Sequence, residues 1–417
     1  MRDRELYAQI LGIRSPWSVT SVELQSAALQ VVVNVRVDPA EALCCPECGD
    51  PAPRYDFRER RRHHLDTCRY RTVLSAEVPR VQCPSHGVHQ VKVPWGEPHS
   101  RFTALFEALV IDWLREANLS AVSRLLSLTW KEVDGIMARA VIRGMARRRM
   151  QAPRRMGVDE TSFQKRHEYV TVVTDLDKCR VLAIADDRES ESLLKFYRSL
   201  TPNQRRRIAT VAMDMHGPYI KATRESLLDA DAKIIFDKFH VAKHLSDAVD
   251  QVRRKEHKEL MAEGDDTLKG TKYLWLQNPV SMPEERWNSG FAELRRMNLR
   301  TARAWRIKEA AMWIWTLRDP QEIQAALKRW IGWAARSRLE PIRRVAATIK
   351  NHLCGVVNAI VTDATNAASE SVNAKIQRVK WMACGFRSRV RFKLATFFHC
   401  GGLHLYPASA GITHTNS

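Results

Sequence analysis

The sequence predicts an α+β protein of several domains, in which a mixed-sheet domain follows two smaller modules. Three observations support this fold class. Two short motifs that pair a cysteine with a second cysteine or a histidine occur before residue 90. β-Branched runs alternate with turns and helical patterns between residues 155 and 236, and residues 241–360 show helical periodicity alone. A chain of 417 residues is long enough for about two to four domains with their own cores.

The chain is strongly basic. It has 67 Lys and Arg residues against 47 Asp and Glu, a formal net charge of +20. Such a charge favours a polyanionic partner, most simply nucleic acid, although solvated arginine faces would give the same count. The chain has no long apolar run and its N-terminus lacks the apolar segment of a signal peptide, so no membrane is expected as a partner. Nine cysteines in so long a chain predict a reducing, cytoplasmic compartment.

The first predicted domain, residues 1–98, is organised by two short cysteine motifs. Residues 28–37 predict a strand with valine at every second position. The motifs Cys45–Pro–Glu–Cys48 and Cys83–Pro–Ser–His86 follow, each with a glycine after it and 34 residues between them. Two such pairs can hold one structural Zn²⁺ tetrahedrally, which predicts a zinc ribbon. Cys44, His63, His64 and Cys68 are alternative ligands, and unrelated buried thiols with a surface histidine are the other interpretation.

Residues 99–150 carry the pattern of a helix-turn-helix. A helix begins near Phe102, a short helix covers residues 120–126, and a Thr129–x–x–Glu132 capping box opens a third helix. Two helices joined by so short a turn predict a helix-turn-helix, although an ordinary helical bundle shares the pattern. The side chains expected to face DNA are Lys131, Arg139, Arg143, Arg147, Arg148 and Arg149.

Residues 151–240 follow the order strand, strand, strand, helix, strand, helix, strand. After a first strand around Asp159, we expect strands at Tyr169–Thr174, Arg180–Ala185, Ile208–Met213 and Lys233–Phe236. Three hairpin-connected strands followed by alternating helices and strands are the layout of a ribonuclease H-like domain, a mixed sheet with helices on both faces.

Residues 241–360 are expected to form an all-helical insertion in this domain. Their helical patterns are rich in Arg and Trp. Tryptophans at helical spacing are more often core than base-stacking platforms, and we expect most of them to be buried. The last predicted segment, residues 361–417, holds the final helix of the catalytic core, which begins at Asn366–Ala–Ala–Ser–Glu370, and the C-terminal tail.

Three carboxylates are candidates for one metal site. Asp159 lies on the first predicted strand, Asp214 follows the fourth, and Glu370 lies on the final helix. Two divalent cations about 3.5–4 Å apart, Mg²⁺ or Mn²⁺, stabilise both oxygens of phosphoryl transfer and require oxygen ligands. Glu370 alone would be read as a surface charge. His240, just after the strand that ends at Phe236, is a further catalytic candidate that could hydrogen-bond a phosphate or orient a metal-bound water; a helix-capping role is the alternative.

Taken in order, the motifs resemble the transposases of the ISL-three insertion-sequence family. They are CPEC, CPSHG, the helix-turn-helix, GVDETSF, VAMDMHGPY, FDKFHVAKHL, TNAASESVNAKIQ and GFR, from about Leu11 to Gly401. The resemblance implies an aspartate-aspartate-glutamate transposase with a ribonuclease H-like core and an N-terminal zinc module. By motif, GVDE supplies Asp159, VAMD supplies Asp214 and NAASES supplies Glu370, separated by 55 and 156 residues.

The resemblance also implies partners and a location. The zinc ribbon and helix-turn-helix would bind double-stranded DNA at the terminal inverted repeats, and a homodimer or higher oligomer would pair the ends. Metal-dependent cleavage and strand transfer into target DNA would follow, in the bacterial cytoplasm at the nucleoid. Two alternatives stay open: a ribonuclease H-like nuclease or resolvase that cuts without joining, and a catalytically inactive DNA-binding regulator.

Overall fold

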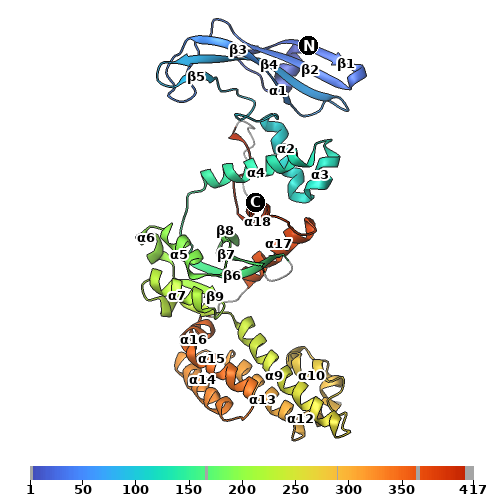
Figure 1. The fold of residues 1–417 in the computed structure, drawn as a ribbon, viewed down its shortest axis with the longest axis vertical. Helices are drawn as coiled ribbons and strands as arrows, with labels where there is room; N and C mark the ends of the chain where they lie inside the picture. The colour runs from blue at the N-terminus through green and yellow to red at the C-terminus, as the bar shows by residue number, and fades with distance from the viewer. Residues whose placement is uncertain (1–2, 165–167, 289, 363–366, 409–417) are drawn as a thin grey trace. The chain divides into compact units, whose positions relative to one another are not determined.

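The computed structural model describes residues 3–164, 168–288, 290–362 and 367–408 (Figure 1). They divide into two compact units. The first comprises Met1–Arg149 with Val379–Cys384 and Val390–Ser417, and the second comprises Met150–Arg378 with Gly385–Arg389. No helix among the described residues is long and apolar enough to span a membrane.

The first unit begins with helix α1 (Asp3–Leu11) and a five-stranded sheet. The strands, in the order β1-β2-β4-β3 with β5 paired to β4, are β1 (Trp17–Gln25), β2 (Gln30–Val37), β3 (Arg54–His63), β4 (Arg71–Cys83) and β5 (Gly87–Gln90). β2 and β4 run parallel, and the other pairs are antiparallel. The alternating valines at 31, 33, 35 and 37 are all buried, as their spacing predicted.

Three helices follow this sheet: α2 (Ala104–Glu116), α3 (Leu119–Leu125) and α4 (Trp130–Arg147). The predicted capping box is confirmed. Thr129 Oγ1 accepts from the Glu132 backbone N–H, and the Glu132 carboxylate accepts from the Thr129 N–H. The apolar stripe of α4 is buried as predicted and comprises Val133, Ile136, Met137 and Ala140. The structure therefore contains the predicted pair of helices joined by a short turn.

The second unit contains a mixed sheet of order β10-β9-β6-β7-β8. Its strands are β6 (Arg155–Gln164), β7 (Glu168–Asp175), β8 (Arg180–Ala185), β9 (Thr210–Met213) and β10 (Ile234–Phe236). β6, β7 and β8 are antiparallel neighbours, whereas β9 is parallel to both β6 and β10. Between the strands lie α5 (Ser190–Arg198), α6 (Pro202–Arg207), α7 (Gly217–Ser226) and α8 (Ala230–Lys233). The predicted mixed sheet is thus present, with its strands in the predicted chain order.

Among the described residues from 238 to 361 there are helices and no strands (Figure 1). The α-helices are α9 (Lys238–Ala262), α10 (Lys272–Leu276), α11 (Glu284–Asn288), α12 (Gly290–Arg296), α13 (Arg300–Ile314), α14 (Pro320–Ala335), α15 (Glu340–Asn351) and α16 (Leu353–Val361). Trp275, Trp305 and Trp330 belong to the same buried core as the sheet residues, whereas Trp313 is 57% exposed and Trp333 45% exposed. Burial therefore accounts for several of these tryptophans, as expected, but not for all.

Two helices complete the described chain, α17 (Ala367–Met382) and α18 (Arg389–Cys400). α17 lies close to β6 at Gly157, where a Cβ would come within 3.3 Å of Ser369 Oγ. On α17, Val372, Ile376 and Val379 are buried. This orientation turns the opposite side of the helix, which carries Glu370, away from the apolar core.

Candidate metal centres and nucleic-acid interface

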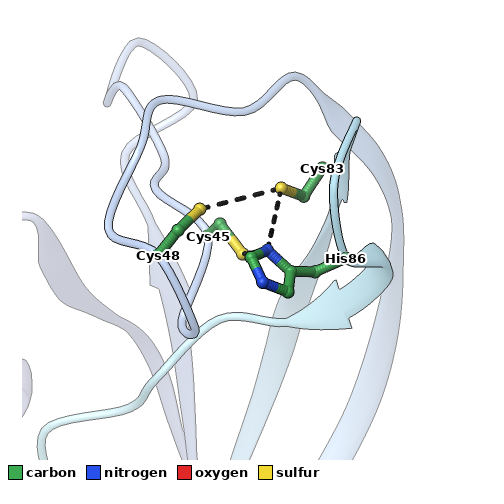
Figure 2. Close-up of side chains that lie close together, drawn as sticks. All are labelled: Cys45, Cys48, Cys83 and His86. Atoms are coloured by element: carbon green, nitrogen blue, oxygen red, sulfur yellow. Dashed lines mark hydrogen bonds between the residues drawn. The ribbon is translucent and has the colours of Figure 1, made fainter.

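The two cysteine motifs come together at one end of the first sheet (Figure 2). Cys83 Sγ lies 3.5 Å from His86 Nδ1 and 3.8 Å from Cys48 Sγ, and Cys45 Sγ lies 4.0 Å from His86 Nδ1. All four ligand atoms lie within 4.8 Å of one another. Thiolates bound at 2.3 Å to a shared tetrahedral zinc would stand about 3.8 Å apart. The spacing of the four atoms therefore fits one zinc ion.

The alternative ligands lie elsewhere. Cys44 and Cys68 are exposed thiols outside this group. His63 Nε2 lies 2.7 Å from Asp66 Oδ1, and His64 Nδ1 lies 2.9 Å from Thr103 Oγ1. Both histidines are thus buried with partners of their own. Over the parts of the chain that the structure describes, the predicted four residues form the only cluster of three or more ligands at metal-binding spacing.

Backbone N–H groups favour ionisation of the Cys45 thiol. The N–H groups of Cys48 and Glu47 lower the pKa of Cys45 to about 7. The N–H of Asp50 acts to lower the pKa of Cys48, but burial and neighbouring groups raise it overall. A turn that directs N–H groups at one sulfur favours its thiolate, which is the form that binds a metal.

Asp159 and Asp214 occupy matching positions on neighbouring parallel strands. Val158 of β6 is the register partner of Met213 of β9, so the two aspartates that follow them are neighbours, Asp159 within β6 and Asp214 directly after the end of β9. Asp159 Oδ2 accepts a hydrogen bond of 2.5 Å from Asn373 Nδ2 of α17. Asp214 Oδ2 lies 3.4 Å from His240 Nδ1 of α9. Each aspartate therefore has a polar partner on a helix, Asn373 on α17 for Asp159 and His240 on α9 for Asp214.

Glu370 lies on α17 one turn before Asn373. Residues three apart on a helix share a face, so Glu370 is on the side of α17 that reaches Asp159. Its side chain is exposed, and no group of three carboxylates at metal-binding spacing occurs among the described residues. Without a bound cation the carboxylates repel one another, which favours a larger distance between Glu370 and the two aspartates. Asn373 had no predicted role; its position three residues after Glu370 is the sequence signal that could have indicated one.

His240 does not cap α9. The N-cap of α9 is Asp237, whose Oδ1 accepts from the Phe239 N–H at 2.7 Å. His240 instead lies between two carboxylates, with Nδ1 near Asp214 and Nε2 3.6 Å from Asp237 Oδ2. The Asp214 carboxylate raises the pKa of His240. Burial acts to raise the pKa of Asp214, but the hydrogen bond and charge of His240 lower it.

The predicted DNA-facing residues in and just after α4 fall into three groups. Lys131 and Arg149 are exposed, and Arg148 is half-buried. Arg139 Nη2 pairs with Glu107 at 2.6 Å, and Arg147 Nη1 donates to the Tyr406 carbonyl at 2.6 Å. These two side chains are held by partners within the first unit.

The prediction that Arg143 faces DNA is wrong, because its side chain is buried. It is 8% exposed, lies 2.6 Å from Glu97 and 2.9 Å from Glu107, and donates to the Leu405 carbonyl. Its guanidinium pairs with groups inside the fold and does not face solvent, because a buried charge requires partners. A candidate that the sequence analysis missed is Arg391 of α18. This exposed side chain pairs with Asp134 at 3.4 Å and lies over the Trp130 ring at 4.4 Å, next to Lys131.

Comparisons with known proteins agree along the chain. A family model described as a transposase matches residues 156–396. A helix-turn-helix domain of transposase family ISL3, the ISL-three family named above, matches residues 91–141. A zinc finger of transposases IS204, IS1001, IS1096 and IS1165 matches residues 41–86.

Similar curated proteins are transposases as well. The chain is 30% identical over 419 residues to the transposase for insertion sequence element IS1557 of Mycobacterium tuberculosis, covering 93% of each chain. It is 25% identical over 402 residues to the transposase for insertion sequence element IS1001 of Bordetella parapertussis, covering 94% of this chain and 97% of the relative. Because one transposase model matches more than half of the chain and a relative 30% identical covers nearly all of it, the chain belongs to the ISL3 family of insertion-sequence transposases.

Proposed function

We propose that this transposase cleaves and joins DNA strands at a site made of Asp159, Asp214 and Glu370. The observation that carries the proposal is the register of β6 and β9, which brings Asp159 and Asp214 to adjacent positions at the carboxyl end of β9. The order of strands agrees with a ribonuclease H-like core, in which residues 241–360 are an all-helical insertion and α17 is the final helix.

The three carboxylates would hold two Mg²⁺ or Mn²⁺ ions. The donor set fits these ions, since it offers oxygen alone and carries three negative charges. When bound, such ions offset the charge that develops on the oxygens of a phosphodiester under attack. Asn373 fixes one oxygen of Asp159 and His240 faces one oxygen of Asp214. Both therefore act as positioning residues, and His240 is also close enough to Asp214 to reach a phosphate bound there.

DNA binding is assigned to the first unit. The helix-turn-helix of α3 and α4 would bind the terminal inverted repeats, with Lys131, Arg148, Arg149 and Arg391 as the proposed DNA-facing cations. Cys45, Cys48, Cys83 and His86 would hold one structural zinc ion. A homodimer or higher oligomer would handle the two ends of an element and the target DNA together.

Strand cleavage and strand transfer, measured with Mg²⁺ on a duplex carrying the terminal repeat, test the active site. Asp159→Asn, Asp214→Asn and Glu370→Gln should each reduce cleavage by at least about 10³-fold, because each removes a charge that holds the cations. Binding to the same duplex should change little, because phosphate contacts of other residues supply most of the affinity.

The control variant is Glu160→Gln. Glu160 is the strand neighbour of Asp159 on the opposite face of β6 and pairs with Arg188 at 2.7 Å. It should cleave and join at close to the normal rate. Normal joining by Glu370→Gln would remove Glu370 from the site. Cleavage without any joining would indicate a nuclease, and binding without cleavage a regulator.

A further inference from the structure

A groove lies between α9 and α15, beside the proposed active site. Its volume is about 220 Å³, and all of its lining residues belong to the second unit. It begins at Met215, the residue after Asp214, and includes His244, one helical turn beyond His240 on α9. A group bound in the groove would therefore lie next to whatever the carboxylates hold.

The groove has an apolar floor and a polar rim. Val241, Ala248 and Ile349 are buried in the floor. The rim is formed by exposed polar side chains of both helices, namely His244, Asp247 and Gln251 from α9 and Arg344 from α15. Arg344 Nη2 lies 3.5 Å from Gln251 Oε1, so these two side chains meet across the opening. The rim thus offers a carboxylate acceptor, a guanidinium donor and an amide that can do both.

We propose that this groove binds a single unstacked nucleobase of the substrate DNA, next to the phosphodiester held at the active site. The proposal rests on the proposed function. A nucleobase has flat apolar faces, which match the floor, and a mixed edge of donors and acceptors, which matches the rim. The volume is below that of pockets for whole small-molecule ligands, so the groove suits one flat group and excludes a duplex.

A backbone phosphate fits the same groove less well. Asp247 would face it as a like charge, and Arg344 already shares its charge with Glu340 at 3.9 Å. Enzymes that act on DNA extrude nucleotides at a cost of a few kcal/mol, which contacts to the extruded base offset. Here the base contacts would hold the strand in place while the carboxylates act on the neighbouring phosphate.

The test uses the full-length protein and synthetic duplexes of the terminal repeat. Each duplex carries 2-aminopurine at one position within about three nucleotides of the cleavage site. This analogue becomes more fluorescent when it leaves the base stack. We expect a several-fold rise at one position with the wild-type protein. In the double variant Gln251→Ala and Arg344→Ala, the population of unstacked base should fall by about tenfold or more. Both side chains are exposed, so the fold is not at risk.

The matched control is Arg343→Ala. Arg343 is also exposed on α15 and also pairs with Glu340, at 3.3 Å, but it does not line the groove. It should leave the fluorescence rise unchanged. No rise at any position, or an equal loss in Arg343→Ala, would overturn the proposal.

An abasic nucleotide at the responding position separates base from phosphate. Wild type and the double variant should bind this duplex equally, although they differ on the intact one. A difference that persists on the abasic duplex and vanishes with a neutral methylphosphonate would assign the groove to a phosphate instead. Asp159→Asn makes the test independent of the catalytic assignment: it should lose cleavage and keep the fluorescence rise. If it cleaves normally, the active-site proposal fails while the fluorescence result still decides the groove.

Discussion

The two candidate metal centres differ in how close their ligand residues lie to one another when no metal is bound. Cys45, Cys48, Cys83 and His86 already lie at the spacing of a tetrahedral site, within 4.8 Å of one another. At the carboxylate site, two aspartates are adjacent through the register of β6 and β9, whereas Glu370 is exposed on α17 and outside any such cluster among the described residues. One site is preformed, and the other is open.

The difference follows from the chemistry of the ligands. A neutral thiol or imidazole can pack against another without electrostatic cost. The second cysteine motif joins the paired strands β4 and β5, and the first lies in the segment between β2 and β3. Ionised carboxylates repel each other until a cation intervenes. In the second unit, Asn373 contacts Asp159 and His240 contacts Asp214. These polar contacts offset part of the negative charge that bound cations would neutralise. We infer that zinc binding contributes to folding, and that Mg²⁺ binding contributes to catalysis.

The largest expected effect is at the zinc site. The double variant Cys48→Ser and Cys83→Ser should lose the one zinc per chain and the ordered structure around residues 41–86, because structural zinc sites contribute folding energy directly. Metal analysis and hydrogen exchange of β4 and β5 measure both. Zinc affinity should also weaken steadily as the pH falls, since protons compete with the metal for every thiolate and most strongly for Cys48, whose pKa is raised.

Cys44→Ser is the matched control for this variant. Cys44 is an exposed thiol directly before Cys45 and lies outside the cluster. It should keep both zinc and fold. A wild-type protein without zinc, or a double variant that retains it, would contradict the assignment and make the two centres alike.

His240→Ala should have the next largest effect, on rate alone. If His240 transfers a proton or directly positions the reacting phosphate, single-turnover cleavage under saturating DNA should fall by about 10²–10⁴. Stability should hardly change, because the helix cap is Asp237. Asp237→Ala is the comparison and should cost about 1 kcal/mol of stability. Unchanged cleavage with a lowered melting temperature in His240→Ala would remove it from the site.

Magnesium should stabilise the open site without being needed for its fold. Without divalent cations the second unit should remain folded, in contrast to the zinc module. Adding Mg²⁺ to about 100 times its dissociation constant should stabilise it by about 2.7 kcal/mol, because the ion binds the folded state. Thermal unfolding should show this shift in Glu160→Gln and not in Asp214→Asn. Unfolding on removal of Mg²⁺ would show that both centres are structural.

The smallest effect is expected from Asn373→Ala. Loss of the hydrogen bond to Asp159 should weaken Mg²⁺ affinity by about 10–100-fold, as for other partners that orient metal ligands. Gln377→Ala is the control, since Gln377 lies one turn further along α17 and makes only a 3.5 Å contact with Thr161. Calorimetric titration of Mg²⁺ compares them. Equal affinity in the two variants would mean that Asn373 does not orient Asp159.

Local features were predictable because their signals are local. The cysteine spacing identified the four zinc candidates that the fold brings together, and the Thr129–Glu132 box marked the start of α4. The strand pattern around Asp159 and Asp214 was also recognisable, and the mixed sheet followed from the order of strands. The roles of Asp159, Asp214, Glu370 and His240 stay predictions.

Only the tertiary structure decided which polar groups meet. Arg143 was expected at a DNA surface, but its partner Leu405 lies 262 residues away and its carboxylate partners belong to other elements. Asn373 contacts Asp159, which is 214 residues away in the sequence. No spacing of residues in the sequence indicates the groove between α9 and α15. The physical reason is that an isolated motif determines its own turn, cap or ligand pair. Whether a charged side chain faces solvent or a buried partner depends on packing between elements that are distant in the chain.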